Sequence, residues 1–225
     1  MLSRLRGKFI RSRWRFGDFA RTVPVSRVFG FDRGTPIDRH YIEGFLAQHS
    51  ADIRGCTLEI GDDSYSRFFG GDAVMEREVL HIDAAAPATY HGDLATPGTL
   101  PESRFDCAVV TQTLHLVWDM RAAIRQLHRA LKPSGCLLLT VPGISQIADD
   151  RWAETWYWSL TPLSAARLAA EEFGESQVKV TSLGNVFAAT SFLQGLAVED
   201  VDSQLLEVHD PTYPVTIAIR AVRGP

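Results

Sequence analysis

The chain has 225 residues, of which 45% are hydrophobic and 22% are charged, and its formal net charge is −4. This composition is typical of a soluble globular protein, and the length fits one domain with a short appendage. No run of about 18 apolar residues occurs and no apolar stretch follows the N-terminus, which argues against a membrane-spanning helix and a secretory signal.

The N-terminal segment, residues 1–28, is predicted to be a basic arm in front of a domain formed by residues 29–225. Its first 27 residues contain eight arginine or lysine residues and a single acid, Asp18, and a short helix is expected near residues 5–16. Such an arm is often only a solvated terminus, but its charge could also support a weak contact with an anionic membrane or with nucleic acid. Because the rest of the chain is acidic, nucleic acid is the less favoured partner.

The domain is predicted to alternate strands with helices or loops. Helices are expected at 37–49, 120–131 and 164–173, a helix or turn at 65–71, and turn or loop segments at 30–36, 96–104 and 132–135. Strands are expected at 56–60, 78–82, immediately before residue 92, 105–111, 136–141, 177–183 and 216–222. This order predicts an α/β fold: an open, mostly parallel, Rossmann-like sheet with helices on both faces and an antiparallel C-terminal edge hairpin.

The first two predicted strands form a nucleoside-binding pattern. The first strand runs into Gly61, where the backbone can approach a ligand closely, and the second ends at Asp83, whose carboxylate could accept both hydroxyls of a ribose. A phosphate-binding loop needs several glycines, whereas Gly61 is followed by Asp62 and Asp63, which would repel a phosphate. The pattern favours a ligand with a ribose and a positive centre but no phosphate, and S-adenosylmethionine fits that description.

The three cysteines, Cys56, Cys107 and Cys136, lie at or inside predicted strands and show no CxxC spacing. We therefore expect buried, reduced thiols in a cytoplasmic protein and no zinc or other metal site.

Five short motifs occur in order along the chain. They are Leu58-Glu-Ile-Gly61, Asp83, Gly92-Asp93-Leu94, Thr111-Gln-Thr-Leu-His115 and Leu131-Lys-Pro-Ser-Gly135. With these motifs the chain resembles the class I S-adenosylmethionine-dependent methyltransferases, in particular the type 11 group, over residues 30–222. It departs from the family in the Asp62–Tyr65 loop, where further glycines are usual. The departure implies either a different loop path or a cofactor affinity that is reduced or lost. The loop is also similar to that of a subgroup associated with sugars.

The resemblance implies a set of cofactor-binding residues. Glu59 and Gly61 would line the methionine end, Asp83 would bind the ribose, Asp93 and Leu94 would face the adenine, Gln112 would lie beside the cofactor, and Arg33 would pair with its carboxylate. For four of these residues a structural alternative stays open. Glu59 could cap a nearby turn, the two aspartates could be turn-formers, and Arg33 could form a surface ion pair.

The candidate catalytic and acceptor-binding residues follow the fourth and fifth predicted strands. His115 is the candidate general base, with His40 and Asp119 as weaker alternatives. The structural alternative for His115 is a histidine at a helix N-terminus that is hydrogen-bonded to the backbone. Trp152, Trp156 and Tyr157 could form a platform for a sugar, although Trp152 and Trp156 have the i, i+4 spacing of a helix packed on the sheet.

The predicted function is methylation of a hydroxyl on a sugar, glycan or small metabolite, with S-adenosylmethionine as methyl donor. Two alternatives remain: a non-catalytic methyltransferase-like partner protein, which the glycine-poor loop favours, and a nucleic-acid methyltransferase that uses the basic arm. The last is disfavoured because no Asn-Pro-Pro-Tyr-type string follows the fourth strand to receive a flipped base.

Overall fold

The structure is a computed structural model that describes residues 17–148 and 152–225. The helix expected near residues 5–16 lies outside the described residues. The helices are α1 (Ile37–Gln48), α2 (Met120–Ala130), α3 (Pro162–Phe173) and α4 (Val186–Leu193). The strands are β1 (Gly55–Ile60), β2 (Val74–His81), β3 (Tyr90–His91), β4 (Phe105–Thr111), β5 (Leu131–Pro142), β6 (Val178–Leu183) and β7 (Thr216–Val222).

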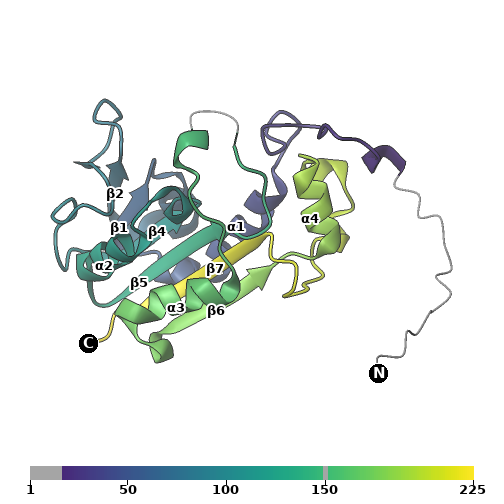
Figure 1. Cartoon of the computed structure of the whole chain (residues 1–225). Coiled ribbons are helices and arrows are strands. Elements are labelled where there is room, and N and C mark those ends of the chain that lie inside the picture. The colour runs from purple at the N-terminus through teal and green to yellow at the C-terminus, as the bar shows by residue number, and fades with distance from the viewer. Residues whose placement is uncertain (1–16, 149–151) are drawn as a thin grey trace, which may run out of the picture.

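The strands form a single seven-stranded sheet in the order β3-β2-β1-β4-β5-β7-β6 (Figure 1). The first five strands along the chain pair in parallel, whereas β7 pairs antiparallel with both β5 and β6. This confirms the predicted open, mostly parallel sheet with an antiparallel C-terminal edge. The two closing strands are not joined by a tight turn, because α4 lies in the connection between them.

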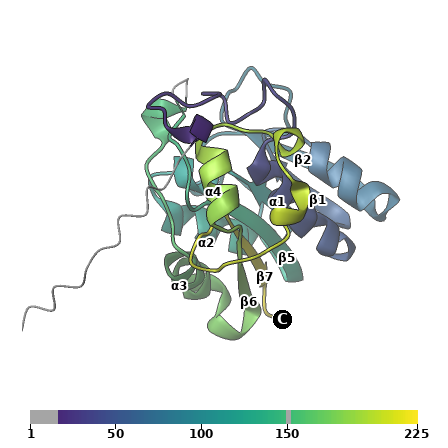
Figure 2. The ribbon, with the colours of Figure 1, turned by 90° about the vertical axis from the view of Figure 1, so that its right-hand side faces the viewer.

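Helices cover both faces of the sheet, as predicted: α2 and α3 lie on one side and α1 on the other (Figure 2). The central strand β4 shows why the core has two halves. Cys107 and Val109 pack with the α1 side, and Ala108 and Val110 pack with the α2–α3 side. A continuous apolar run is required here because a central parallel strand is buried on both faces.

Some local elements differ from the sequence prediction. β2 begins at Val74 rather than at residue 78, and α4 was not predicted. Strand β5 includes the turn expected at 132–135 as a bulge, since its regular pairing with β4 resumes only at Cys136. Residues 153–155 form a single 3₁₀ turn rather than a longer helix.

The segment before α1 is fixed to the segment after α4, as the adjacent ribbons in Figure 1 show. The backbone N–H groups of Val25 and Ser26 donate to the carbonyl of Gln194, at 2.8 and 3.1 Å. Farther along, Thr35 donates to Glu199 through both its backbone N–H and its hydroxyl. The predicted boundary at residue 28 therefore lies within a segment that contacts the domain, and it stays a prediction.

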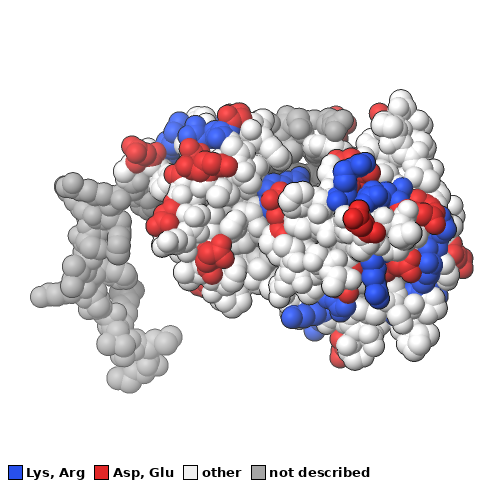
Figure 3. Space-filling view, turned by 180° about the vertical axis from the view of Figure 1, so that it is seen from behind, with Lys and Arg blue, Asp and Glu red and all other residues white. Residues whose placement is uncertain are grey.

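Two surface properties are relevant to contacts with membranes and nucleic acids. Within the described ranges, no helix is long and apolar enough to cross a membrane. On the face seen in Figure 3, basic and acidic side chains of the described residues are interspersed. That arrangement differs from the continuous basic stripe that is typical of nucleic-acid-binding surfaces.

Candidate functional site

A cavity of about 770 Å³ lies at the carboxyl ends of the parallel strands. Gly61 and Ile82 follow β1 and β2, Gln112 follows β4, and Pro142 ends β5, and all four line it. Open α/β sheets bind their ligands at this edge, and the volume is that of a small-molecule site. The cavity is therefore the candidate functional site.

The cavity brings together most of the site residues expected from the sequence. Those that line it are Glu59, Gly61, Asp93, Leu94, Gln112, His115, Trp152, Trp156 and Tyr157. They come from segments far apart in the chain, and the sheet is what places them around one space. The individual role of each stays a prediction.

Gly61 gives the cavity an open stretch of backbone. It has a φ of +93°, and a Cβ built on it would meet no other atom within 4 Å. Its N–H donates to the carbonyl of Leu80 at 3.0 Å. A ligand can thus approach this residue closely, but the N–H is already used and does not face an anion.

Glu59 is buried at the end of β1, and its carboxylate fixes the loop that follows. Its two oxygens accept hydrogen bonds from the backbone N–H groups of Tyr65 and Ser66, at 3.0 and 2.7 Å. Burial raises the pKa of Glu59, while these hydrogen bonds oppose that shift. The turn-capping alternative thus describes an interaction that is present, although the residue also lines the cavity.

The loop after Gly61 follows a path suited to its side chains. Asp62 accepts from the N–H of Ser64 at 2.8 Å. The ring of Tyr65 packs beside Phe69 on the α1 side of the sheet, and its hydroxyl accepts from Arg39 at 2.7 Å. Tyr65 is therefore built into the wall through contacts that a glycine-rich loop could not make.

Two charged residues in the first turn of α1, Asp38 and Arg39, also line the cavity and were not identified from the sequence. The Asp38 Oδ1 atom is buried and has no hydrogen-bond partner among the described residues, and burial raises the pKa of this carboxyl. The Arg39 guanidinium lies 5.8 Å from the ring centre of Phe31 and 5.9 Å from that of Tyr65. Their position in the first turn of the helix predicted after Pro36 was the sequence signal that could have identified them.

Gln112 is held in an unusual conformation at the end of β4. Its φ is +45°, a value that residues other than glycine seldom adopt. Its Nε2 atom is buried without a hydrogen-bond partner in the described part of the chain. Strained backbone conformations are frequent at binding sites. A buried donor without a partner is rare and calls for an explanation, so this amide is a candidate ligand contact.

His115 is buried in the wall of the cavity beside Trp156, with ring centres 4.4 Å apart. Burial lowers the pKa of His115 to about 4, so the ring is neutral near pH 7. Its Nδ1 atom has no hydrogen-bond partner within the described ranges. Its carbonyl accepts from the backbone N–H groups of Tyr157 and Trp158, which fixes the aromatic segment next to it.

The aromatic residues divide into an inner and an outer group. Trp156 is in the inner group, stacked on Phe29 with ring planes 7° apart. Trp118 and Tyr157 are in the outer group, with exposed fractions of 68% and 44%. Trp118 stacks on Trp158 at 5.3 Å and meets Tyr157 edge-on at 5.4 Å. The sequence analysis missed Trp118, which is isolated from the Trp152–Trp158 segment in the chain.

Two of the expected site residues do not line the cavity. Arg33 makes two hydrogen bonds of 2.7 Å to the carboxylate of Asp200, which raise the pKa of its guanidinium. Asp83 is exposed, and its carboxylate accepts from the N–H of Ala85 at 2.9 Å. These contacts are the surface ion pair and the turn-forming aspartate given above as structural alternatives.

A group of potential metal ligands is formed by Cys56, Glu76 and Glu78, whose ligand atoms lie within 4.8 Å of one another. Arg104 already contacts both carboxylates at 2.5 Å, and Tyr90 donates a hydrogen bond to Glu78. Arg104 therefore pairs with both carboxylates and balances one of their two negative charges.

Comparison with known proteins identifies the family of this chain. A family model described as a methyltransferase domain matches residues 20–177. No curated protein matches the chain. One solved structure with a similar fold is an S-adenosylmethionine-dependent methyltransferase from Mesorhizobium loti, with 16% identity, a TM-score of 0.54, and coverage of 83% of this chain and 98% of that one.

Two other solved structures show how widely this fold is used. Phosphoethanolamine N-methyltransferase 2 of Haemonchus contortus, in complex with S-adenosyl-L-methionine, is 14% identical with a TM-score of 0.53, over 83% of this chain and 53% of that one. The cyclase SpnF is 15% identical with a TM-score of 0.51, over 85% of this chain and 83% of that one. At such identities the likeness establishes the fold alone.

Proposed function

Because this chain belongs to the class I S-adenosylmethionine-dependent methyltransferases, we propose that it methylates a hydroxyl group of a sugar, glycan or related small metabolite. The observation that carries the proposal is a single cavity with two kinds of wall. Polar side chains from β1, β4 and α1 line one part, and aromatic rings around His115 line another. A methyl transfer needs this combination, because a charged donor and an acceptor must meet in one water-poor space.

The polar part is proposed to hold the cofactor. Its methionine end carries an ammonium and a carboxylate, and Asp38 and Arg39 offer the complementary charges from the cavity wall. Arg39 thereby takes the role that the sequence analysis gave to Arg33. Gly61 provides room beside the backbone, and the unpaired Nε2 of Gln112 offers a donor.

Asp93 and Leu94 line the same cavity and are proposed to face the adenine. One carboxylate oxygen of Asp93 already accepts from the N–H of Ala95 at 2.8 Å. Glu59 supports the methionine end by holding the loop. Asp83 would reach the ribose only after its carboxylate left the N–H of Ala85. The residues present therefore fit a ligand with a zwitterionic end and a nucleoside end.

Bound S-adenosylmethionine supplies an activated methyl group on a positive sulfur. His115 is proposed to accept the proton of the acceptor hydroxyl. The acceptor oxygen would bond to the methyl carbon as the carbon–sulfur bond breaks, which would leave the sulfur as a neutral thioether. The pKa of about 4 does not oppose this role, because a hydroxyl becomes strongly acidic once its oxygen is alkylated. A neutral imidazole with an unpaired Nδ1 can take that proton late in the transfer.

The outer aromatic group is proposed to bind the acceptor. Trp118 and Tyr157 line the cavity and expose much of their rings, and aromatic faces pack well against the C–H surface of a sugar ring. Trp158 keeps Trp118 in place, because its ring stacks on Trp118 and its Nε1–H donates to the carbonyl of Val117 at 3.1 Å. These contacts support a sugar or glycan acceptor over a flexible apolar one.

The first test is calorimetric titration of the purified protein with S-adenosylhomocysteine, followed by an acceptor screen that begins with glycans. We expect a dissociation constant in the micromolar range, about −8 kcal/mol. Absence of binding at millimolar ligand would instead favour the non-catalytic partner protein, which the side-chain-filled loop after Gly61 also suits.

A further inference from the structure

The guanidinium of Arg39 is held in the wall of the active-site cavity by uncharged groups. Its Nη1 atom donates a hydrogen bond to the hydroxyl of Tyr65 at 2.7 Å, and the rings of Phe31 and Tyr65 lie beside it. Among residues 17–148 and 152–225, no carboxylate forms an ion pair with it. Because a buried charge is usually paired, this half-buried cation is available to an anionic group of a ligand.

The loop after β1 fixes the position of Tyr65. Glu59, which is buried at the end of β1, accepts hydrogen bonds from the backbone N–H groups of Tyr65 and Ser66. The Tyr65 ring packs against Phe69, with ring centres 6.0 Å apart. Backbone and ring are thus held without the help of the hydroxyl, so the hydroxyl oxygen is a fixed acceptor that faces the first turn of α1.

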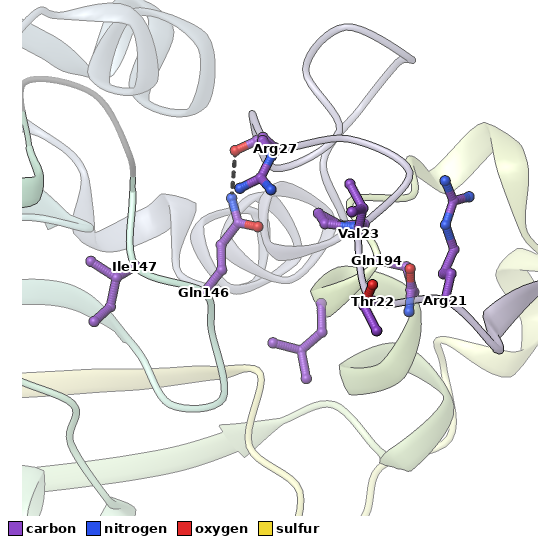
Figure 4. A pocket seen from close by; sticks show the side chains of 9 residues that line it. Arg21, Thr22, Val23, Arg27, Gln146, Ile147 and Gln194 are labelled. Atoms are coloured by element: carbon purple, nitrogen blue, oxygen red, sulfur yellow. Dashed lines mark hydrogen bonds between the residues drawn. The ribbon is translucent and has the colours of Figure 1, made fainter.

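Phe31 is the second ring beside Arg39, and it comes from the segment before α1. Its backbone N–H donates to the carbonyl of Val28 at 3.0 Å. The same segment is tied to the loop after β5, because the side-chain amide of Gln146 donates to the carbonyl of Arg27 at 2.7 Å, a contact drawn in Figure 4. Arg39 therefore lies between two elements that other contacts hold in place.

This arrangement matters because an arginine side chain has many rotamers in solution. Ordering such a side chain during binding opposes the binding, whereas a protein that orders it beforehand avoids that loss. The flat guanidinium binds a carboxylate through two parallel hydrogen bonds only in the right orientation. A fixed acceptor on one of its nitrogen atoms selects one orientation, and the Tyr65 hydroxyl is such an acceptor.

The neighbouring carboxyl completes the pattern. Asp38 precedes Arg39 in the first turn of α1, lines the same cavity, and has a buried Oδ1 atom without a hydrogen-bond partner among the described residues. An ammonium and a carboxylate on one ligand would meet the opposite charge at each of these side chains. Of the two, only Arg39 is supported by the loop after Gly61, through Tyr65.

We propose that Tyr65 is a positioning residue for the cofactor, because its hydroxyl holds Arg39 in the orientation that binds the carboxylate of the methionine end. This inference rests on the proposed function, in which Arg39 makes that contact. It also gives the glycine-poor loop a role. Where further glycines would offer bare backbone, this loop offers a side chain that orients a cation, and the site thereby selects ligands that carry a carboxylate.

Calorimetry on the full chain tests the proposal through a double-mutant cycle. Tyr65→Phe removes the hydroxyl and keeps the ring, and we expect it to lower S-adenosylhomocysteine affinity about tenfold, about 1.4 kcal/mol. In the Arg39→Met background the same substitution should cause no further loss, because Tyr65 acts through Arg39. Decarboxylated S-adenosylhomocysteine, which lacks only the carboxylate, should not distinguish Tyr65→Phe from the unmodified chain.

Tyr41→Phe is the matched control. Tyr41 is also on α1, and its hydroxyl donates to the carbonyl of Leu206 at 3.0 Å, but it does not line the cavity. This variant should bind S-adenosylhomocysteine like the unmodified chain, and urea unfolding should show that every variant is folded.

Three results would overturn the positioning role and leave the proposed function standing. They are unchanged S-adenosylhomocysteine affinity in Tyr65→Phe while Arg39→Met weakens it, additive losses in the double variant, and an equal loss of affinity for the decarboxylated ligand. Absence of S-adenosylhomocysteine binding by the unmodified chain would instead overturn the proposed function and this inference together.

Discussion

Replacing Gly61 by alanine tests whether a ligand approaches the backbone at the end of β1. The added Cβ meets no other atom within 4 Å, so the substitution creates no clash. Its stability cost is the strain of a positive φ, about 1–2 kcal/mol. Because Gly61 lines the cavity, the added methyl group would occupy space that the proposed cofactor needs.

Gly98→Ala is the matched control. Gly98 has a φ of +86°, has equally open space around an added Cβ, and does not line the active-site cavity. Urea unfolding should show both variants destabilised by about 1–2 kcal/mol. Calorimetry with S-adenosylhomocysteine should show a loss of at least tenfold, about 1.4 kcal/mol, in Gly61→Ala alone. Equal affinities in the two variants would refute the close approach at Gly61.

Three further predictions concern individual side chains. Arg39→Met should lower S-adenosylhomocysteine affinity at least tenfold, about 1.4 kcal/mol, while Arg33→Met leaves it unchanged; the reverse result would restore the carboxylate contact to Arg33. Burial lowers the pKa of His115 from 6.5 to about 4, so the unfolded chain binds more protons between these values and stability falls as pH falls through them. Urea unfolding should show a loss of up to about 3 kcal/mol over that range that is absent in His115→Gln; an identical pH profile in the variant would contradict the burial argument. Asp83→Ala should weaken cofactor binding by about tenfold if its carboxylate turns to the ribose, and unchanged calorimetric affinity would place the ribose contact elsewhere.

The sheet was predictable because its signals are local. The run from Phe105 to Thr111 has no polar interruption beyond Asp106, as a strand covered by helices on both faces requires. The glycine after β1 and the histidine segment after β4 were predicted to lie in the site because each follows a strand end. Parallel strands end at one edge of the sheet. This reasoning placed most of the expected residues around one cavity.

The details that the sequence analysis missed depend on contacts between distant segments. Arg33 and Arg39 are close in sequence and chemically identical, and only the position of Asp200 after α4 separates a surface ion pair from a cavity residue. Likewise, stacking on Phe29 places Trp156 in the inner aromatic group, whereas Trp118 is exposed. No local pattern encodes such long-range partners.

The pairing of residues 25–35 with residues 194–199 has a consequence for how the protein is made. Phe29 and Phe31, which line the active-site cavity, leave the ribosome early, but the segment that fixes them emerges only near the end of synthesis. A nascent chain can form the parallel strands one after another as they appear. The cavity wall, however, closes in the last stage, when α4 and the residues after it arrive. Binding competence is thus acquired late in translation, and a chain released before residue 194 would contain the parallel strands but lack both β7 and a complete site.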